Sequence, residues 1–463
     1  MPIHTVMQKY STSVSALGKL IADSAQVLHG TANDYDKLLD LIGDARFVLI
    51  GEASHGTHEF YAERARITQR LIEEKGFMAV AVEADWPDAY RVNHYVRQTP
   101  ISKAEYKDGS AIDALSGFQR FPSWMWRNTD VAHFVDWLKM HNDESTEQQD
   151  KVGFYGLDLY SMFSSMEEVL KYLDKVDPDA AALARKRYSC FDHFNRDSQR
   201  YGYTTGLGLS VSCEDEVHQQ LNELLDRKLQ HIKSGDSADI DAQFYAQQNA
   251  KVVRNAEEYY RSMFRGRVSS WNLRDGHMAE TLTALDKHLS EGAAKPAKIV
   301  VWAHNSHVGD ARATEIGQQG ELNLGQLIRQ EYGDQCFLLG MTTYHGSVTA
   351  SSDWDAPAEF KYVRPSVMDS YEEAMHAAEV PRFVLPLKFN GLLRTALSKS
   401  RLSRAIGVIY RPATERQSHY FYVNLPQQFD AILHIDKTRA VKPLDHLNVL
   451  ISGEAPETYP VGI

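Results

Sequence analysis

Ionisable side chains stand directly after four apolar runs of the sequence. The runs are 46–50, 77–82, 152–155 and 298–302, and each has the length and continuous apolarity of a strand buried on both faces. The carboxyl ends of parallel strands lie along one edge of a sheet, where ligands bind. We therefore expect one cluster at that edge, made of Glu52, His55, Glu83, Asp85, Asp158, His304 and His307.

The segment 51–59 carries the first candidate for proton transfer. Gly51 and Gly56 allow a tight turn from a strand into a helix. In such a turn His55 can act as a general base if a carboxylate fixes its tautomer. The alternative is that Glu52 and His55 only cap the helix and bond the turn. On the following helix, the spacing places four charged residues on one face next to His55: Glu59, Glu63, Arg66 and Arg70.

Three carboxylates end or follow the next two runs. Glu83 directly ends an apolar strand, where a carboxylate is costly without a partner, and this favours a functional role. Asp85 precedes Trp86 and Pro87, a pattern typical of a helix start, so capping and ligand binding are equal alternatives. For Asp158 a structural and a functional role are equally supported.

His304 and His307 lie three residues apart in the turn after the run 298–302. Two such histidines could bind a metal ion or stabilise a developing oxyanion, and the alternative is two turn histidines satisfied by local hydrogen bonds. The zinc motif H-E-x-x-H fails because Ala62 stands where its second histidine is needed. A histidine that acts as a base must also keep a free lone pair. We therefore expect metal-independent catalysis without a cofactor, with a divalent metal as the alternative.

Aromatic residues gather between the second and third runs. They are Trp86, Tyr90, Phe118, Phe121, Trp124 and Trp126. Tryptophans most often belong to a core, and the alternative is an aromatic-lined pocket for a bulky ligand. The candidates for substrate binding are Glu59, Asp85, Trp86, Asp158, Trp124 and Trp126.

Several common catalytic motifs are absent from the sequence. There is no G-x-S-x-G elbow, since the segment 51–56 has the wrong spacing. The segment 206–211 lacks the third glycine and the preceding strand of a dinucleotide loop, and no Walker A sequence exists. These absences disfavour a serine-elbow or nucleotide-dependent mechanism.

The alternation of strands and helices predicts an α/β fold with a mostly parallel central sheet covered by helices. We expect a further strand at 335–339 and helices at 58–75 and 124–141. Four C-terminal runs could add antiparallel edge strands, namely 383–385, 405–410, 421–423 and 431–435.

The middle of the chain has no comparable strand run. It predicts an all-helical lobe over 178–267 that forms a pocket wall, with a long helix at 241–261. The expected organisation is a first part of the α/β core at 1–177, the insertion, and a second part of the core at 268–463.

Composition limits the partners and the compartment. The 463 residues include 50 basic and 62 acidic side chains, a net charge of −12 that argues against nucleic-acid binding. No run approaches the roughly 18 apolar residues of a membrane span. Cys190, Cys213 and Cys336 are far apart and odd in number, without a C-x-x-C pair. We expect a reduced, cytoplasmic compartment, no structural disulfide and no signal peptide.

Taken together, three blocks resemble the erythromycin esterase family in order and spacing. They are Gly51-Glu52-x-x-His55-Gly56-x-x-Glu59, the strand that ends at Glu83, and His304-x-x-His307. The resemblance implies an α/β core with a helical insertion and hydrolysis of a macrolide lactone by water that a histidine activates. His55 matches that base, Glu52 and Glu83 the carboxylates around it, His304 and His307 the opposite histidines, and Arg66 an arginine on the next helix.

The segments 86–93, 121–127 and 415–420 resemble a housekeeping branch of this family, which need not act on macrolides. The resulting hypothesis is a hydrolase for an ester or lactone of a bulky small molecule. Glu83 or Glu52 orients His55, and His304, His307 or Arg66 stabilises the oxyanion. The alternative is a scaffold of this type that only binds a small ligand.

Overall fold

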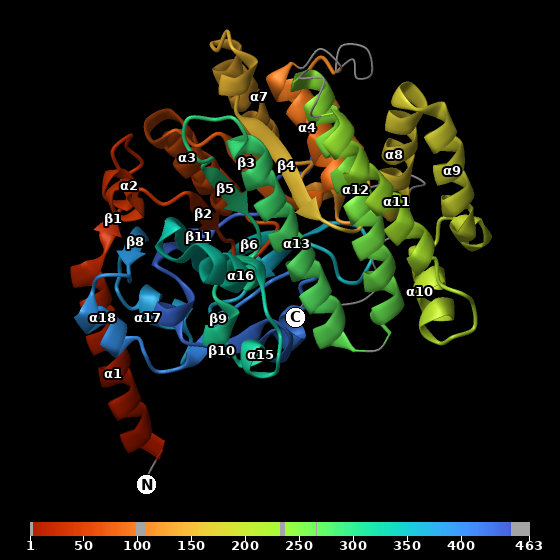
Figure 1. The fold of residues 1–463 in the computed structure, drawn as a ribbon. Helices are drawn as coiled ribbons and strands as arrows, with labels where there is room; N and C mark the ends of the chain where they lie inside the picture. The colour runs from red at the N-terminus through yellow and green to blue at the C-terminus, as the bar shows by residue number, and fades with distance from the viewer. Residues whose placement is uncertain (1–2, 99–107, 232–236, 265, 446–463) are drawn as a thin grey trace.

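The structure is a computed structural model that describes residues 3–98, 108–231, 237–264 and 266–445 (Figure 1). Its centre is a mostly parallel β-sheet with helices on both faces, and a helical lobe lies beyond β4 (Gly153–Asp158) at one end of the sheet. The predicted α/β class with an inserted helical lobe is therefore confirmed.

Nine strands of the described residues form one sheet, in the order β1-β8-β11-β6-β2-β5-β3-β4, with β7 paired to β6 outside this path. The pairs from β11 to β4 are parallel, whereas β1, β7 and β8 pair antiparallel. The remaining strands are β1 (Gln26–Val27), β2 (Phe47–Ile50), β3 (Ala79–Asp85), β5 (Ile299–Trp302), β6 (Cys336–Ala350), β7 (Glu359–Val363), β8 (Arg382–Pro386) and β11 (Ala431–Thr438).

Side chains of the central strands alternate between two hydrophobic cores, which explains why the predicted runs are apolar throughout. In β2, Val48 and Ile50 belong to one core and Phe47 and Leu49 to the other. The first core is covered by α2 (Asp36–Ile42), α3 (His58–Lys75), α6 (Ala111–Ala114) and α7 (Thr129–Asp143). The second is covered by α1 (Ile3–Ser24), α13 (Arg267–Ser290), α16 (Leu324–Tyr332), α17 (Tyr371–His376) and α18 (Gly391–Ala396), and α4 (Trp86–Arg97) contributes to both.

Between β4 and α13 the described residues form helices only. They are α8 (Met162–Val176), α9 (Pro178–Tyr188), η4 (Ser189–Phe194), α10 (Ser198–Gly206), α11 (Glu214–His231) and α12 (Ser237–Ser262). A separate hydrophobic cluster from Leu159 to Met263 gives this lobe its own core. The cluster includes α8, which precedes the predicted start of the insertion at 178. The predicted domain boundaries stay a prediction.

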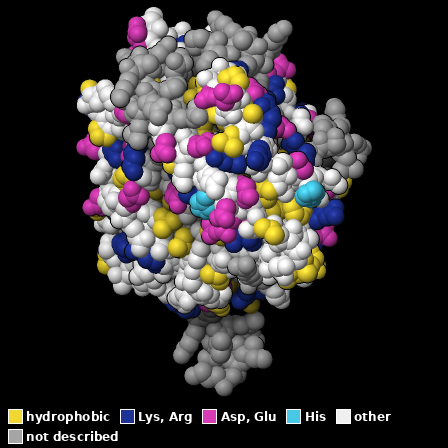
Figure 2. All heavy atoms as spheres, turned by 45° about the vertical axis from the view of Figure 1, so that its right-hand side comes forward, with side chains coloured by type: hydrophobic (Ala, Val, Ile, Leu, Met, Phe, Trp, Pro, Cys, Tyr) yellow, Lys and Arg dark blue, Asp and Glu magenta, His cyan; other side chains and the backbone are white. Residues whose placement is uncertain are grey.

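The lobe side of the molecule carries mixed charge. Figure 2 shows acidic and basic side chains interspersed over this face rather than gathered into one basic patch. Among the described residues, no helix combines the length and the apolarity that crossing a membrane requires.

The expectation of no structural disulfide is wrong. Cys190 in η4 and Cys213 just before α11 are bonded to each other, with their Cα atoms 6.0 Å apart. The bond links two parts of the lobe that the sequence separates by 23 residues. Wide spacing along the chain did not prevent the pairing, because the lobe's helices fold back on one another. The expectation of a reduced compartment rested on the absence of a disulfide, so the bond between Cys190 and Cys213 removes that argument.

The predicted run 383–385 lies in β8, which pairs antiparallel with β1 and β11 as expected, but the other C-terminal runs differ from the prediction. β11 was expected to be antiparallel, but it runs parallel to β6 and is antiparallel only to β8. The run 421–423 lies in β10 (Tyr420–Val423), which pairs with β9 (Arg401–Arg404) in a second sheet. The run 405–410 forms no strand and makes isolated bridges to Ser54 and Ser351.

Helix boundaries also differ in places. α7 begins at Thr129 and not at 124, because the side chain of Asn128 accepts hydrogen bonds from the N–H groups of Asp130 and Val131 and caps the helix there. The short helices are η1 (Leu115–Gly117), η2 (Ser123–Met125), η3 (Gln148–Asp150), α14 (Asn305–Val308), η5 (Ala311–Ala313), α15 (Glu315–Gln318), η6 (Gly333–Gln335), η7 (Pro412–Thr414), α19 (Glu415–Ser418) and α20 (Leu425–Gln428).

Two glycines let the loop after β2 lie close to neighbouring segments. A Cβ atom on Gly51 would stand 2.1 Å from Oδ1 of Asn305 in the loop after β5. A Cβ atom on Gly56 would stand 1.8 Å from the carbonyl oxygen of Thr349 in β6. The Gly56 carbonyl also accepts hydrogen bonds from the N–H groups of Thr349 and Val441. This loop is therefore held in place at the carboxyl edge of the sheet.

We expect Gly56→Ala to lower the free energy of unfolding by about 1–3 kcal/mol or more, because the added methyl group meets a backbone that cannot yield. The matched control is Gly276→Ala inside α13, where a Cβ atom would meet nothing within 4 Å. It should stabilise the protein by about 0.5–1 kcal/mol through helix propensity. Urea unfolding of both variants checks this, and shifts of the same sign would contradict it.

Candidate functional site

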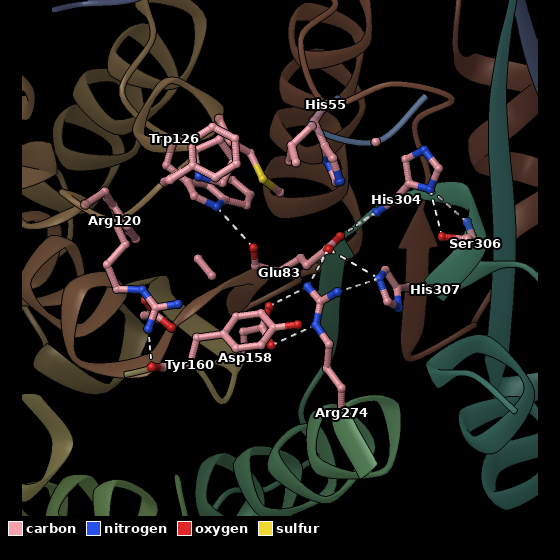
Figure 3. Close-up of a pocket in the computed structure, with 18 of the residues that line it drawn as sticks. His55, Glu83, Arg120, Trp126, Asp158, Tyr160, Arg274, His304, Ser306 and His307 are labelled. Atoms are coloured by element: carbon pink, nitrogen blue, oxygen red, sulfur yellow. Dashed lines mark hydrogen bonds and ion pairs between the residues drawn. The ribbon is translucent and has the colours of Figure 1, made fainter. Parts of the chain in front are cut away.

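A cavity of about 140 Å³ lies at the carboxyl edge of the sheet (Figure 3). Residues that follow four different strands line it: His55 after β2, Glu83 and Asp85 in β3, Asp158 in β4, and His304 and His307 after β5. The structure thus brings together six of the seven residues that strand-end position predicted. The seventh, Glu52, is fully buried directly behind His55.

Glu52 is the carboxylate that contacts His55. Nδ1 of His55 lies 2.9 Å from Oε1 of Glu52, while Oε2 forms an ion pair of 2.9 Å with Arg64 in α3. The side chains of Glu52 and Arg64 are fully buried. Nδ1–H therefore donates to the carboxylate, and the lone pair of the His55 imidazole is on Nε2. Thr57 and not Glu52 is the N-cap residue of α3, so the capping part of the alternative is wrong, while the bond from His55 to Glu52 does hold the turn.

Arg64, and not Arg66, is the arginine of α3 that reaches the site. Its guanidinium lies over the rings of Tyr61 and Trp302, at 4.4 and 5.0 Å from their centroids. The side chain of Arg66 is 56% exposed and pairs with Glu63 instead. Two residues along a helix correspond to about 200° of rotation, so the two arginines point in nearly opposite directions. The predicted role of Arg66 is therefore wrong.

Three donor groups, from α13 and from α14 with its N-cap residue, face the carboxylate of Glu83. Its Oε2 accepts the backbone N–H of His304 at 2.8 Å, and its Oε1 lies 2.8 Å from Nη2 of Arg274 and 3.3 Å from Nε2 of His307. Burial alone would raise the pKa of this carboxyl, but the charges of His307 and Arg274 outweigh burial and hold the pKa well below its usual range. Glu83 is therefore ionised and saturated with donors.

Arg274 joins two strands of the site and was missed by sequence reasoning. From α13 it donates to both carboxylate oxygens of Asp158, at 3.0 and 2.6 Å, as well as to Glu83. Its guanidinium also lies 4.9 Å from the ring centroid of Tyr160. Figure 3 shows it between Asp158 and His307. No local pattern in the sequence marks this arginine, because Asp158 and Glu83 lie more than one hundred residues away from it.

His304 is held in one tautomer by the turn that contains it. As the N-cap of α14, its Nδ1 accepts the backbone N–H of Ser306 at 3.2 Å and lies 2.8 Å from the Ser306 hydroxyl. Burial keeps the pKa of His304 well below its ordinary value, and the positive charge of His307 acts in the same direction. The ring is therefore neutral and carries its proton on Nε2. The ring centroids of His304 and His55 are 5.0 Å apart.

His307 has the opposite charge state. Its Nδ1 lies 2.9 Å from both oxygens of Asp275, and the ring stacks on Trp271 at 4.6 Å. Burial alone would lower the pKa of His307, but the carboxylates of Asp275 and Glu83 raise it to about 10. The two histidines of the H-x-x-H pair thus differ in charge at neutral pH.

The predicted substrate-binding residues separate into two groups. Asp85, Asp158 and Trp126 line the cavity. Asp85 makes no side-chain capping bond and pairs with Arg120 at 3.4 Å, and the indole N–H of Trp126 donates to the Glu83 carbonyl.

The other three residues do not reach the cavity, so the prediction is wrong for them. Trp86 packs in the second core between Tyr90, Tyr155 and Phe244, and Trp124 belongs to the first core. Glu59 accepts hydrogen bonds from Arg439 outside the site.

The lobe's part in the wall is small. Of the described residues in the predicted insertion 178–267, Arg267 alone lines the cavity, and the wall on that side continues with Trp271 and Arg274 of α13. The remaining wall comes from Phe118 to Trp126 and from loops that include Trp354 and Val408.

Metal ligands are not grouped in the described part of the chain. There, no three His, Cys, Asp or Glu side chains are arranged to hold an ion. The carboxylates of Glu52, Glu83 and Asp158 are instead paired with histidines and arginines of the site.

Comparison with known proteins gives the family. The erythromycin esterase model matches residues 72–438, which include Glu83, His304 and His307 but begin after His55. Erythromycin esterase type II of Escherichia coli is 22% identical over 431 residues, covering 88% of this chain and 93% of the relative.

Two solved structures share the fold. One is described as a succinoglycan biosynthesis protein, with a TM-score of 0.75 and 20% identity, covering 93% of this chain and 99% of that one. The other is a mutant of the erythromycin esterase EreC in its open conformation, with a TM-score of 0.60 and 17% identity, covering 91% and 96%. The family match extends over most of the chain, and the fold agrees with it. The chain belongs to the erythromycin esterase family, and this membership indicates a hydrolase.

Proposed function

We propose that this protein hydrolyses an ester or lactone, with His55 as the general base that activates water. The observation that carries the proposal is the contact of His55 Nδ1 with buried Glu52 at the wall of the cavity. A carboxylate on one ring nitrogen fixes the tautomer and leaves the other nitrogen as the proton acceptor. Glu83 is bonded to other donors, so Glu52 is the residue that orients the base.

In the proposed reaction, His55 takes a proton from water while the water oxygen bonds to the ester carbonyl carbon. The neutral His304 has an N–H to offer to the resulting oxyanion, and the charges of Arg274 and His307 add a positive field. Collapse of the tetrahedral intermediate breaks the bond from carbon to the alcohol oxygen. The His55 imidazolium returns its proton to that oxygen, which completes the hydrolysis.

The size of the cavity bears on the substrate. A cavity of about 140 Å³ is close to one of roughly 150 Å³ that holds benzene. The carbonyl and its nearest substituents would fit inside, beside Trp126 and Trp271. The rest of a bulky molecule would lie outside or require the cavity to widen. The open conformation named for EreC supports such widening, and a macrolide would depend on it.

A non-catalytic small-ligand scaffold is the second candidate. The aromatic wall that includes Trp126 and Trp271 supports ligand binding without chemistry equally well. Turnover separates the two functions. A panel of phenyl esters, simple lactones and macrolides, followed by the masses of the products, identifies the substrate class if hydrolysis occurs.

His55→Ala should lower kcat on the best ester of this panel by at least about a hundredfold, since the loss of a general base typically costs 10²–10⁴ in rate. The melting temperature should change little. His58→Ala is the matched control, because His58 is partly exposed and bonded to Asp130 away from the cavity. Equal activity of the two variants would remove His55 from the mechanism.

We propose that catalysis needs no metal ion, because the groups above supply the base, its orientation and the oxyanion donors. After dialysis against a strong chelator, activity should be unchanged, and elemental analysis should find no stoichiometric transition metal. If activity were lost on chelation and restored by zinc or manganese, the metal-dependent alternative would replace this mechanism.

Arg64→Met should destabilise the protein by about 3–5 kcal/mol, because it leaves the buried carboxylate of Glu52 without its cation. Activity should fall as well, since Glu52 can then take up a proton and release His55. Arg66→Met is the control on the same helix and should stay within about 0.5 kcal/mol of the unsubstituted protein. Urea unfolding followed by tryptophan fluorescence measures both, and similar stabilities would contradict the assignment of Arg64.

A further inference from the structure

We infer that Asp275 is a positioning residue that keeps His307 permanently protonated, so that His307 serves as a fixed cation beneath Glu83 and not as a proton-transfer group. The inference deepens the proposed function and rests on it for its activity measurement. The charge state of His307 can be measured without any substrate.

The contact between Asp275 and His307 is two-sided and buried. Both carboxylate oxygens lie 2.9 Å from Nδ1, and Asp275 has no exposed surface. Its Oδ1 also accepts the backbone N–H of Leu324 at 2.8 Å, which fixes the carboxylate at the start of α16. An anion held this way donates no proton and favours an N–H on the nitrogen it faces.

The rest of the ring is held as firmly. Its Nε2 lies 3.3 Å from Oε1 of Glu83, and its face stacks on Trp271 with an angle of 7° between the planes. Trp271 is itself anchored by a hydrogen bond from its indole N–H to the Leu322 carbonyl. Both ring nitrogens thus face carboxylates, and rotation toward a substrate would break both contacts.

The charges around His307 come from every element packed against it. Asp275 and Arg274 belong to α13, Glu83 to β3, His304 to the turn before α14, and Glu321 to the loop before α16. Asp275 and Glu83 supply negative charge in direct contact. Arg274 opposes them at 3.3 Å from Nε2, and His304 is neutral. The balance favours the imidazolium, with a pKa of about 10.

A fixed cation at this position has a consequence for the proposed oxyanion donor. Glu83 accepts the backbone N–H of His304 more strongly as a carboxylate than as a neutral acid, and the His307 charge helps to keep it ionised. Asp275 therefore acts through His307 and Glu83 on the placement of His304. It does not contact the cavity itself.

The test is Asp275→Asn, which keeps the shape and one acceptor oxygen but removes the charge. Because the carboxylate raises the pKa of His307, its removal lowers that pKa. The imidazolium charge should then be lost within the assay range as pH rises. The ratio of variant to unsubstituted kcat/KM should be near one at the acid end and fall about tenfold at one pH unit above the new pKa.

The control is Asp286→Asn, the same substitution on α13 at a residue that pairs with Arg46 away from the cavity. It should leave the ratio independent of pH. The direct measurement is ¹⁵N NMR of labelled histidines, with the His307 signal assigned by its loss in His307→Gln. The unsubstituted protein should show a His307 imidazolium up to about pH 9. In Asp275→Asn the His307 ring should lose its proton at a lower pH than in the unsubstituted protein.

Three results would overturn the inference. The first is a neutral His307 at pH 8 in the unsubstituted protein, which needs no variant to fold. The second is an unchanged titration in Asp275→Asn. The third is the expected titration with a pH-independent activity ratio, since Asp275 would then be merely structural. If no ester is hydrolysed, the proposed function is wrong, but the NMR measurement still decides the charge state of His307 because it uses no substrate.

Discussion

Burying ionised carboxylates at the end of a hydrophobic sheet is the constraint on which the rest of this structure depends. Glu52 and Glu83 follow strands whose side chains are fully buried, and a charge in such surroundings is costly unless it is paired and hydrogen-bonded. The cations come from outside the sheet, Arg64 from α3 on one face and Arg274 from α13 on the other. The site therefore requires both helical layers to be docked.

The sequence was sufficient for the parts of the site that depend on strand ends. The apolar runs predict the parallel strands, and the position just after each strand predicts that His55, Glu83, His304 and His307 converge. Direction within the sheet was less predictable at the C-terminus, because the apolar run in β11 does not distinguish a parallel from an antiparallel neighbour. Pairing depends on the long connections, which the run itself does not describe.

Residues on helices were predicted poorly for a geometric reason. Arg64 and Arg66 are equally suitable in type, and only the packed face of α3 decides which one meets Glu52. Similarly, Trp86 and Trp126 differ in role because Trp86 packs against Tyr155 in the second core, whereas Trp126 lines the cavity. Arg274 and Asp275 gave no signal at all, since their contacts depend on how α13 returns to the sheet after the lobe.

The return of α13 to the sheet separates most of the helical lobe from the residues that carry the charge network. The lobe from α8 to α12 has its own hydrophobic cluster and its own disulfide. Among the described residues of the predicted insertion, only Arg267 lines the cavity, and it lies in the first turn of α13. The charged groups that pair with Glu52, Glu83 and Asp158 are carried by the sheet edge, α3 and α13. Insertions or deletions between α8 and α11 could therefore alter the outer approach to the cavity while leaving its charge network intact, whereas α12 is fixed to the second core by Phe244 against Trp86.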